Sequence, residues 1–172
     1  MTAPRVVLVG SMGAGKTTVG RLVADALGVE FLDTDEVVEQ QAGRTVAEIF
    51  IDEGEARFRE LERQAVAEAL ASHDGVLALG GGAVLDAGTR ELLAKHPVVF
   101  LRVGLSDAAQ RVGLGVSRPL LLGNVRGRMK QLLDERTPVY EAVARHVVDT
   151  DGRSADEVAS EVRSVVEDGG HG

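Results

Sequence analysis

The stretch Gly10-Ser11-Met12-Gly13-Ala14-Gly15-Lys16-Thr17 matches the phosphate-loop pattern G-x-x-x-x-G-K-[ST]. It follows an apolar run at residues 6–9 and precedes a helical pattern, which is the context that this motif requires. Glycines let the backbone N–H groups point inward at phosphate oxygens, and the N-terminus of the helix adds a partial positive charge. The motif therefore predicts a nucleotide-binding site in which Lys16 reaches the β- and γ-phosphates and the Thr17 hydroxyl binds Mg²⁺.

The rest of the chain alternates short apolar runs with amphipathic helical patterns. The predicted strands are residues 6–9, 29–32, 76–79, 98–101 and 147–148. Helical stripes lie between these strands, and Gly28 and Gly43 are placed to end two of the helices. Such alternation predicts an α/β fold, with a parallel sheet between two layers of helices. Ligands bind such sheets at the carboxyl ends of the strands, so the residues just after strands are candidates for chemistry.

Two segments depart from this regularity. Between residues 113 and 124, three glycines, a proline and consecutive leucines interrupt the helical period, which predicts a flexible flap. Farther on, Thr137-Pro138 matches an N-cap followed by a first-turn proline, so we expect one helix to end near Arg136 and another to begin. No repeat or linker is present in the sequence. We expect a single domain over residues 1–168 and a frayed tail at 169–172.

Composition argues against several classes of protein. The 172 residues have a net charge of -8 and only 3% aromatic residues, which disfavours binding to a nucleic-acid backbone or stacking on bases. Cysteine is absent, which excludes disulfides, cysteine–zinc sites and a thiol nucleophile. No apolar run approaches the roughly 20 residues that span a bilayer, and the N-terminus lacks the layout of a signal peptide. We therefore expect a cytoplasmic protein that binds neither nucleic acid nor membrane.

Two carboxylates, Asp33 and Asp35, follow the second predicted strand. After a phosphate loop, one carboxylate is expected to hold hydrated Mg²⁺ while the other accepts the proton of an acceptor hydroxyl. The alternative is that Asp33 or Thr34 caps the next helix and the acids are merely solvated. The residues alone leave the division of roles between the two aspartates open.

Gly80-Gly81-Gly82 follows the third predicted strand, where the missing Cβ atoms would let a small polar ligand lie against the backbone. The alternative for this run is a tight exit from the strand. Arginine is abundant, at 16 residues against 3 lysines, so a single arginine is most often a solvated surface charge. Together, however, Arg59, Arg118 and Arg136 suit an anionic acceptor. They predict a clamp on a carboxylate and a flap arginine that reaches the transferring phosphoryl group.

In their order and spacing, these motifs resemble those of shikimate kinases. The shared motifs are Gly10 to Thr18, Leu32-Asp33-Thr34-Asp35, Phe58-Arg59, Gly80-Gly81-Gly82, Arg118-Pro119-Leu120-Leu121 and Arg136. The resemblance runs from Arg5 to about Arg153 and implies an enzyme that uses ATP to phosphorylate the 3-hydroxyl of shikimate, on the route to chorismate and the aromatic amino acids. It also implies a three-layer sandwich with a five-stranded parallel sheet, similar to nucleoside monophosphate kinases. An acceptor-binding segment at about 33–61 and a lid at about 113–124 complete the implied fold.

The same resemblance assigns roles to individual residues. The residues implied to bind ATP are Gly13, Ala14, Gly15, Lys16, Thr17, Thr18, Arg111, Arg118 and Arg153, the adenine lying between Arg111 and Arg153. Those implied to bind shikimate are Asp35, Arg59, Gly80, Gly81, Gly82 and Arg136, the two arginines holding the carboxylate. Thr17 and Asp33 are assigned to Mg²⁺, and the implied catalytic residues are Lys16, Asp35 and Arg118. Ala155 stands where relatives often have a proline, which is a departure close to the adenine pair.

Two alternatives remain at this point. The first is another small-molecule kinase on the same scaffold, acting on gluconate or a nucleoside monophosphate. In the adenylate-kinase type a glycine usually follows the loop lysine, whereas here Thr17-Thr18 follows Lys16. The second is a non-catalytic regulator that binds ATP and transfers nothing. The two aspartates weigh against it, because such a protein has no need for an acceptor base. The family is commonly monomeric, and we expect a monomer.

Overall fold

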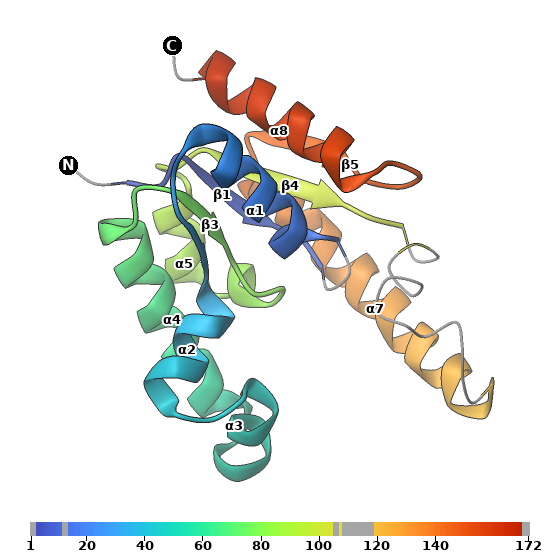
Figure 1. Cartoon of the computed structure of the whole chain (residues 1–172). Helices are drawn as coiled ribbons and strands as arrows, with labels where there is room; N and C mark the ends of the chain where they lie inside the picture. Colours follow the sequence, from blue (N-terminus) through green and yellow to red (C-terminus); the bar gives the residue numbers. More distant parts are fainter. Residues whose placement is uncertain (1–2, 12–13, 105–106, 108–118, 170–172) are drawn as a thin grey trace.

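A single sheet of five parallel strands forms the centre of the molecule (Figure 1). The computed structural model describes residues 3–11, 14–104, 107 and 119–169. The strands are β1 (Val6–Val9), β2 (Phe31–Asp33), β3 (Val76–Ala78), β4 (Val98–Arg102) and β5 (His146–Asp149). Their order is β2-β3-β1-β4-β5, so β1 lies in the middle between β3 and β4. Because all pairs are parallel, the carboxyl ends of the strands meet at one edge, which confirms the predicted sheet.

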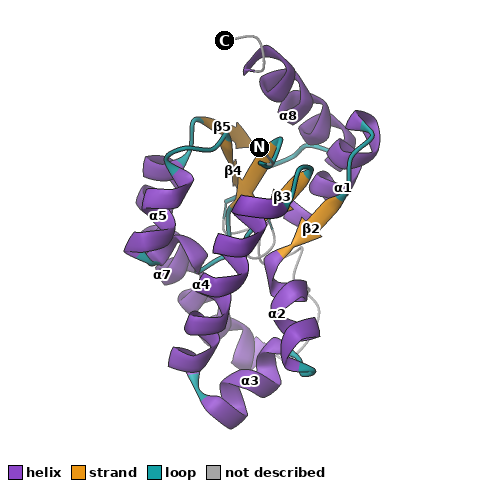
Figure 2. Cartoon of the chain, turned by 90° about the vertical axis from the view of Figure 1, so that its left-hand side faces the viewer, coloured by secondary structure: helices purple, strands orange, loops and turns teal. Residues whose placement is uncertain are grey.

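Helices cover both faces of this sheet, which gives the expected three layers (Figure 2). They are α1 (Lys16–Leu27), α2 (Thr34–Ala42), α3 (Val46–Glu53), α4 (Glu55–Ser72), the 3₁₀ turn η1 (Ala83–Leu85), α5 (Ala87–Leu93), α7 (Pro119–Val143) and α8 (Ala155–Gly169). Helices α1 and α8 pack on one face, and α4, α5 and α7 pack on the other. Within the described ranges, no helix has both the length and the apolarity that crossing a membrane requires.

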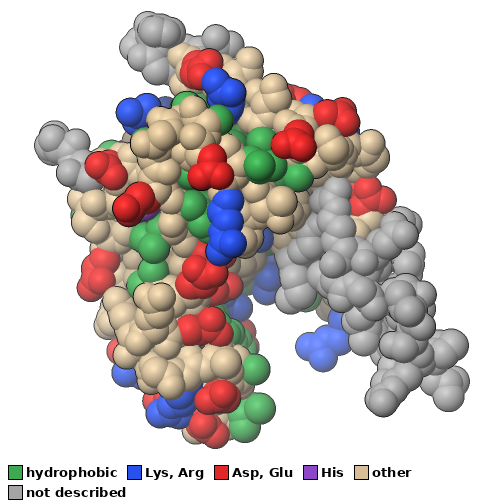
Figure 3. All heavy atoms as spheres, in the orientation of Figure 1, with side chains coloured by type: hydrophobic (Ala, Val, Ile, Leu, Met, Phe, Trp, Pro, Cys, Tyr) green, Lys and Arg blue, Asp and Glu red, His purple; other side chains and the backbone are tan. Residues whose placement is uncertain are grey.

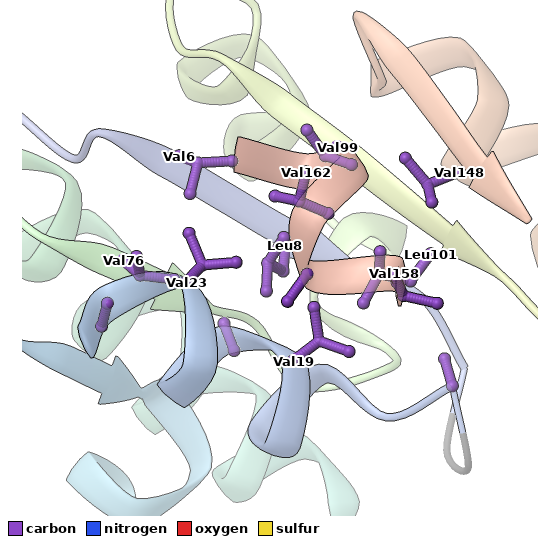
Figure 4. Packing of buried hydrophobic residues seen from close by; sticks show 14 of the residues in the cluster. Val6, Leu8, Val19, Val23, Val76, Val99, Leu101, Val148, Val158 and Val162 are labelled. Atoms are coloured by element: carbon purple, nitrogen blue, oxygen red, sulfur yellow. The ribbon is translucent and has the colours of Figure 1, made fainter. Parts of the chain in front are cut away.

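The central strand explains why the predicted strands are continuous apolar runs. All four residues of β1 are buried, and they alternate between the two faces. Val6 and Leu8 belong to the core beneath α1 and α8, where they meet Val23 and Val162 (Figure 4). The other two residues of β1 belong to the core beneath α4, α5 and α7. A strand covered on both faces has no position for a polar side chain until it ends.

A small lobe formed by α2, α3 and the first turns of α4 extends beyond the sheet (Figure 1). It has its own core, which consists of Val38, Ile49, Phe58 and Ala65. The predicted helix end at Gly43 is confirmed, because α2 ends there. The next helix, α3, begins after Thr45, whose hydroxyl accepts a hydrogen bond from the Glu48 N–H at 3.1 Å. The lobe is therefore a compact unit at the carboxyl edge of the sheet.

The predicted break at Thr137-Pro138 is wrong. Helix α7 is continuous from Pro119 to Val143 and contains Pro138. Proline removes one backbone hydrogen bond from the helix, but the residues beyond it are anchored by Tyr140. This side chain is 1% exposed and its ring packs against Phe100, with 5.0 Å between the ring centroids. The packing of Tyr140 against Phe100 therefore outweighs the preference of Thr137-Pro138 for the start of a new helix.

The prediction of a flap at 113–124 is wrong for its last six residues. Its first six residues lie outside the described ranges, whereas residues 119–124 are the first turns of α7. Proline at the first position of a helix costs nothing, because its missing N–H has no partner there in any case. Pro119 therefore marks the start of a helix, whereas the sequence pattern predicted that it belongs to the flap.

Candidate active site

A cavity of about 710 Å³ opens at the carboxyl ends of the strands, between the phosphate loop, the α2–α4 lobe and α7. The space-filling view shows the surface hollowed at this place, with basic side chains in the hollow (Figure 3). The lining residues are Ser11, Gly15, Lys16, Thr17, Thr18, Asp33, Asp35, Val46, Phe58, Arg59, Glu62, Leu79, Gly80, Gly81, Gly82, Met129, Leu132, Leu133 and Arg136. The cavity thus brings together most of the residues that the sequence predicts for the site.

The phosphate loop forms one wall of the cavity. Gly15 adopts the left-handed conformation, with a φ of 86°, and begins α1 directly beneath the cavity. The Lys16 ammonium donates hydrogen bonds to the carbonyl oxygens of Gly10 at 2.6 Å and Ser11 at 3.1 Å. Burial lowers the pKa of Lys16 to about 8, although the carboxylates of Asp33 and Asp35 oppose this shift. Phosphate oxygens would add further negative charge beside this buried cation.

Asp33 caps a helix, as one of the two interpretations of the sequence predicted, and its two carboxylate oxygens have different partners. Oδ1 accepts a hydrogen bond from the Asp35 N–H at 2.8 Å and so caps α2. Oδ2 accepts a hydrogen bond from the Thr17 hydroxyl at 3.4 Å. Capping therefore leaves one carboxylate oxygen directed at the phosphate loop.

The Thr17 hydroxyl and the Asp33 carboxylate are a fitting donor set for Mg²⁺. Both supply oxygen, and this ion is usually held by one or two protein groups together with substrate phosphates and water. Among the described residues no group of three or more His, Cys, Asp and Glu side chains could enclose a metal ion by itself. The arrangement therefore suits a metal that arrives with a nucleotide and does not suit a permanently enclosed metal.

Asp35 also lines the cavity. Burial raises the pKa of Asp35 from 3.8 to about 6, and repulsion from Asp33 and Glu62 adds to the shift. Its Oδ1 atom is buried and has no hydrogen-bond partner in the described part of the chain. A carboxylate with a raised pKa and an unused oxygen, facing a cavity, is suited to accept a hydrogen bond or a proton from a ligand hydroxyl.

Two arginines approach the cavity from different helices. Arg59 on α4 donates a hydrogen bond to Glu62 at 2.8 Å, and Glu62 is only 3% exposed. Burial raises the pKa of Glu62, while the Arg59 guanidinium opposes that shift. Arg136 on α7 keeps its Nε atom buried without a hydrogen-bond partner among the described residues. Both guanidinium groups line the same cavity as Asp35. An anionic ligand bound there would accept a hydrogen bond from the unused Nε–H of Arg136.

The triple-glycine turn explains how these side chains come so close together. A Cβ atom on Gly80 would lie 2.6 Å from Oδ1 of Asp35, and one on Gly82 would lie 2.5 Å from Nη1 of Arg59. A Cβ atom on Gly81 would lie 3.4 Å from Nη1 of Arg136. None of the three glycines has a positive φ, so at Gly80 and Gly82 it is the space that requires glycine, whereas a Cβ atom on Gly81 would make an ordinary van der Waals contact. Gly80 and Gly82 therefore make room for two predicted ligands of the acceptor, Asp35 and Arg59, and Gly81 lies beside the third, Arg136.

Other predicted residues are not brought to this cavity. Ala14 is 1% exposed and packs in the core beneath the loop. Arg153 does not line the cavity; its guanidinium donates hydrogen bonds to the Asp149 carbonyl at 2.9 Å and to Glu161 at 2.7 Å. The predicted site residues that lie outside the described ranges are Gly13, Arg111 and Arg118.

Sequence reasoning missed several residues of the cavity. Glu62 lies three residues after Arg59, a spacing that pairs charges on one face of a helix and was available as a signal. Ser11 contributes a buried hydroxyl that has no hydrogen-bond partner in the described part of the chain. The apolar wall formed by Met129, Leu132 and Leu133 gave no signal, because these leucines and this methionine are indistinguishable in sequence from core residues.

Known proteins match this chain over nearly its whole length. A model of the family described as shikimate kinase matches residues 12–167. A shikimate kinase of Thermobifida fusca is 58% identical over 156 residues, which cover 91% of each chain. One of Salinispora arenicola is 59% identical over 164 residues, which cover 95% of this chain and 98% of that protein. The solved structure of a shikimate kinase from Acinetobacter baumannii in complex with shikimate has a TM-score of 0.88, with 37% identity over 98% of this chain and 95% of that one.

Proposed function

The chain belongs to the shikimate kinase family and phosphorylates the 3-hydroxyl of shikimate with ATP, and we propose that it does so in the cavity between the phosphate loop, the α2–α4 lobe and α7. The observation that supports this placement most strongly is the triple-glycine turn. It makes room for one carboxylate and one arginine and lies beside a second arginine, next to a phosphate loop. A base, a clamp for an anionic acceptor and a phosphate cradle are the parts that this reaction needs.

ATP is proposed to occupy the phosphate-loop side of the cavity. Lys16 and the backbone N–H groups that begin α1 stabilise the negative charge of the β- and γ-phosphates. Thr17 and Asp33 are proposed to hold Mg²⁺, which supplies further positive charge against the phosphate oxygens. Arg118 is proposed to reach the γ-phosphate from the lid. The adenine is proposed to lie between Arg111 and Arg153, and Arg153 would then have to exchange or share its contacts with Asp149 and Glu161.

Shikimate is proposed to occupy the side of the cavity formed by the glycine turn. Arg59 and Arg136 bind its carboxylate, and Asp35 accepts a hydrogen bond from the 3-hydroxyl. In the transfer, the hydroxyl oxygen forms a bond to the γ-phosphorus and the bond to the bridging β,γ-oxygen breaks. The proton of the hydroxyl passes to Asp35, and ADP leaves. The carboxylate that has the raised pKa thus stands where a proton must be accepted.

Apolar residues are proposed to keep water from the transferring group. Val46 and Phe58 of the lobe and Leu132 of α7 line the cavity. Their side chains offer no hydrogen bonds, so they leave a water molecule on their side of the cavity with fewer partners. Exclusion of water would favour transfer to shikimate over hydrolysis of ATP. The monomeric state and the cytoplasmic location expected from the sequence remain predictions.

The test is the release of ADP from ATP and Mg²⁺ by the purified protein, with shikimate, gluconate, AMP or CMP in separate reactions. Turnover is expected with shikimate alone. Turnover with another acceptor and none with shikimate would contradict the proposed substrate, and bound ATP without any turnover would favour the non-catalytic regulator. Arg128→Ala is a suitable control variant, because Arg128 is exposed on α7 and does not line the cavity.

Gly82→Ala is expected to reduce kcat/KM for shikimate by about 10–100-fold while the melting temperature changes by less than about 3 °C. The new methyl group would lie 2.5 Å from the Arg59 guanidinium, which is the far end of a flexible side chain and can move away. Folding is therefore spared, but Arg59 leaves the position in which it binds the carboxylate. Steady-state kinetics and thermal unfolding measure the two effects separately.

Gly127→Ala is the matched control for this substitution. Gly127 lies within α7, and a Cβ atom there would have no neighbour within 4 Å among the residues that the structure describes. Its kinetics should equal those of the wild type. If Gly82→Ala kept full activity, Arg59 would not be needed at its observed position.

A further inference from the structure

We infer that two buried hydroxyl groups, those of Thr34 and Tyr140, are positioning residues that hold the triple-glycine turn in the arrangement that binds the acceptor. The inference rests on the proposed function and adds two residues that touch neither substrate. Thr34 connects the turn to α2, and Tyr140 connects it to α7. These two helices supply Asp35 and Arg136, respectively.

Thr34 is the first residue of α2 and lies between the two aspartates of the site. It is 0% exposed, and its hydroxyl accepts a hydrogen bond from the Gly80 N–H at 3.2 Å, across 46 residues of sequence. A buried N–H that loses its acceptor is destabilised by the full cost of its desolvation, so this bond determines where Gly80 lies. Gly80 in turn lies against Asp35. The hydroxyl therefore fixes the distance between the turn and the proposed base.

Tyr140 holds the next residue of the turn from the opposite side. Its hydroxyl donates a hydrogen bond to the Gly81 carbonyl at 2.5 Å, across 59 residues of sequence. The side chain is 1% exposed, and its ring is held by Phe100. Burial raises the pKa of the phenol, so the proton that makes this bond is retained at neutral pH. Because Tyr140 lies one helical turn after Arg136, both side chains reach the turn from the same face of α7.

The two bonds together connect the three acceptor-binding groups through one short piece of backbone. Gly80 is tied to α2 and Gly81 to α7, while Gly82 adjoins Arg59 of α4. A shift of the turn by a fraction of an ångström would change the distances to all three groups at once. Packing alone does not require the hydroxyls, because valine and phenylalanine fill nearly the same volumes as threonine and tyrosine. The bonds to the turn account for the Thr34 hydroxyl and, together with an interaction with the Arg136 guanidinium, for the Tyr140 hydroxyl.

Thr34→Val and Tyr140→Phe test this inference. Each is expected to raise the KM for shikimate by about 5–30-fold, while the KM for ATP changes by less than about twofold. Thr34→Ser keeps the hydroxyl and loses only a methyl group, so it should retain a shikimate KM close to the wild-type value even if its melting temperature falls. Thr150→Val is the matched control, since the buried Thr150 hydroxyl donates to the Arg102 carbonyl at 2.9 Å, away from the turn. This control should lower stability without changing the KM for shikimate.

A second measurement needs neither substrate nor turnover. Amide hydrogen exchange in a peptide that covers residues 79–83 should be at least tenfold faster in Thr34→Val and Tyr140→Phe than in the wild type or Thr34→Ser. Unchanged exchange, or faster exchange with an unchanged shikimate KM, would overturn the positioning role. If the wild type failed to turn over shikimate, the proposed function would fail, and the exchange rates would still decide whether the hydroxyls hold the turn.

The affinity for shikimate can be followed in the Thr34 variants without turnover. The chain has one tyrosine and no tryptophan, so its intrinsic emission comes from Tyr140 alone. The wild type and the two Thr34 variants can be titrated with shikimate. The dissociation constant should be larger for Thr34→Val than for the wild type and nearly unchanged for Thr34→Ser. Equal dissociation constants for valine and serine would contradict the role of the hydroxyl.

Discussion

Asp35→Asn is expected to lower kcat by about 10²–10⁴-fold, because the asparagine amide cannot accept the proton of the shikimate hydroxyl. Asparagine has the same shape as aspartate and can still accept a hydrogen bond from that hydroxyl, so the KM for shikimate should change much less than kcat. Glu36→Gln is the matched control. Glu36 lies next to Asp35 in the first turn of α2 but is exposed, and its removal should leave kcat unchanged.

The same substitution is expected to make the protein more stable at neutral pH. Burial raises the pKa of Asp35 from 3.8 to about 6, so between these two pH values the folded chain binds a proton that the unfolded chain has released. Stability therefore falls as the pH rises through this window, and above it the buried carboxylate costs at most about 3 kcal/mol. The asparagine side chain carries no charge and avoids this cost. The gain is reduced because Lys16 loses an attractive neighbour.

Chemical denaturation at several pH values would measure this gain. The difference in the free energy of unfolding between Asp35→Asn and the wild type should be small near pH 4 and should grow to about 1–3 kcal/mol by pH 7. In the wild type, kcat/KM for shikimate should fall about tenfold per pH unit below pH 6, as Asp35 becomes protonated. A variant that lost neither activity nor the acid limb of this profile would show that Asp35 is not the base.

The sequence was sufficient for those parts of the fold that local signals determine. Buried parallel strands must be apolar throughout, and glycine after a helical stripe ends the helix, so the strand order along the chain and the stop at Gly43 were predictable. The continuity of α7 through Pro138 was not predictable. It depends on the packing of Tyr140 against Phe100, two residues that are 40 positions apart in the sequence.

The candidate site shows the same division. The motifs, together with the resemblance to shikimate kinases, predicted Lys16, Asp35, Arg59 and Arg136, and all four line the cavity. The reason for three consecutive glycines was not predictable, since it lies in the distances from the turn to side chains on three different helices. The hydrogen bond of the Thr34 hydroxyl could not be predicted from the sequence for the same reason. Its partner Gly80 is far away in sequence, and the sequence pattern is equally consistent with Thr34 as an N-cap of the helix.

Arg136→Ala is expected to raise the KM for shikimate by about 10²-fold, with a smaller effect on kcat and little effect on the KM for ATP. Truncation removes a charged partner from the carboxylate in a buried setting, where the lost interaction is not replaced by water at equal strength. Arg59 remains in place and holds part of the affinity. Arg136→Lys should be intermediate, because lysine keeps the charge but lacks the fork of two parallel N–H donors. Arg128→Ala on the same helix is the control.

A substrate modification shows whether Arg136 acts on the carboxylate itself. The methyl ester of shikimate keeps the ring and its hydroxyls but carries no negative charge. The wild type should lose about 10²-fold in kcat/KM with the ester, whereas Arg136→Ala should lose only a few-fold more than it has already lost, since the partner of the carboxylate is then absent. Losses that multiplied in full would mean that the guanidinium and the carboxylate do not meet. In that case Arg136 would influence the site through Gly81 and Lys16, the groups that it faces in the cavity, and the clamp would consist of Arg59 alone.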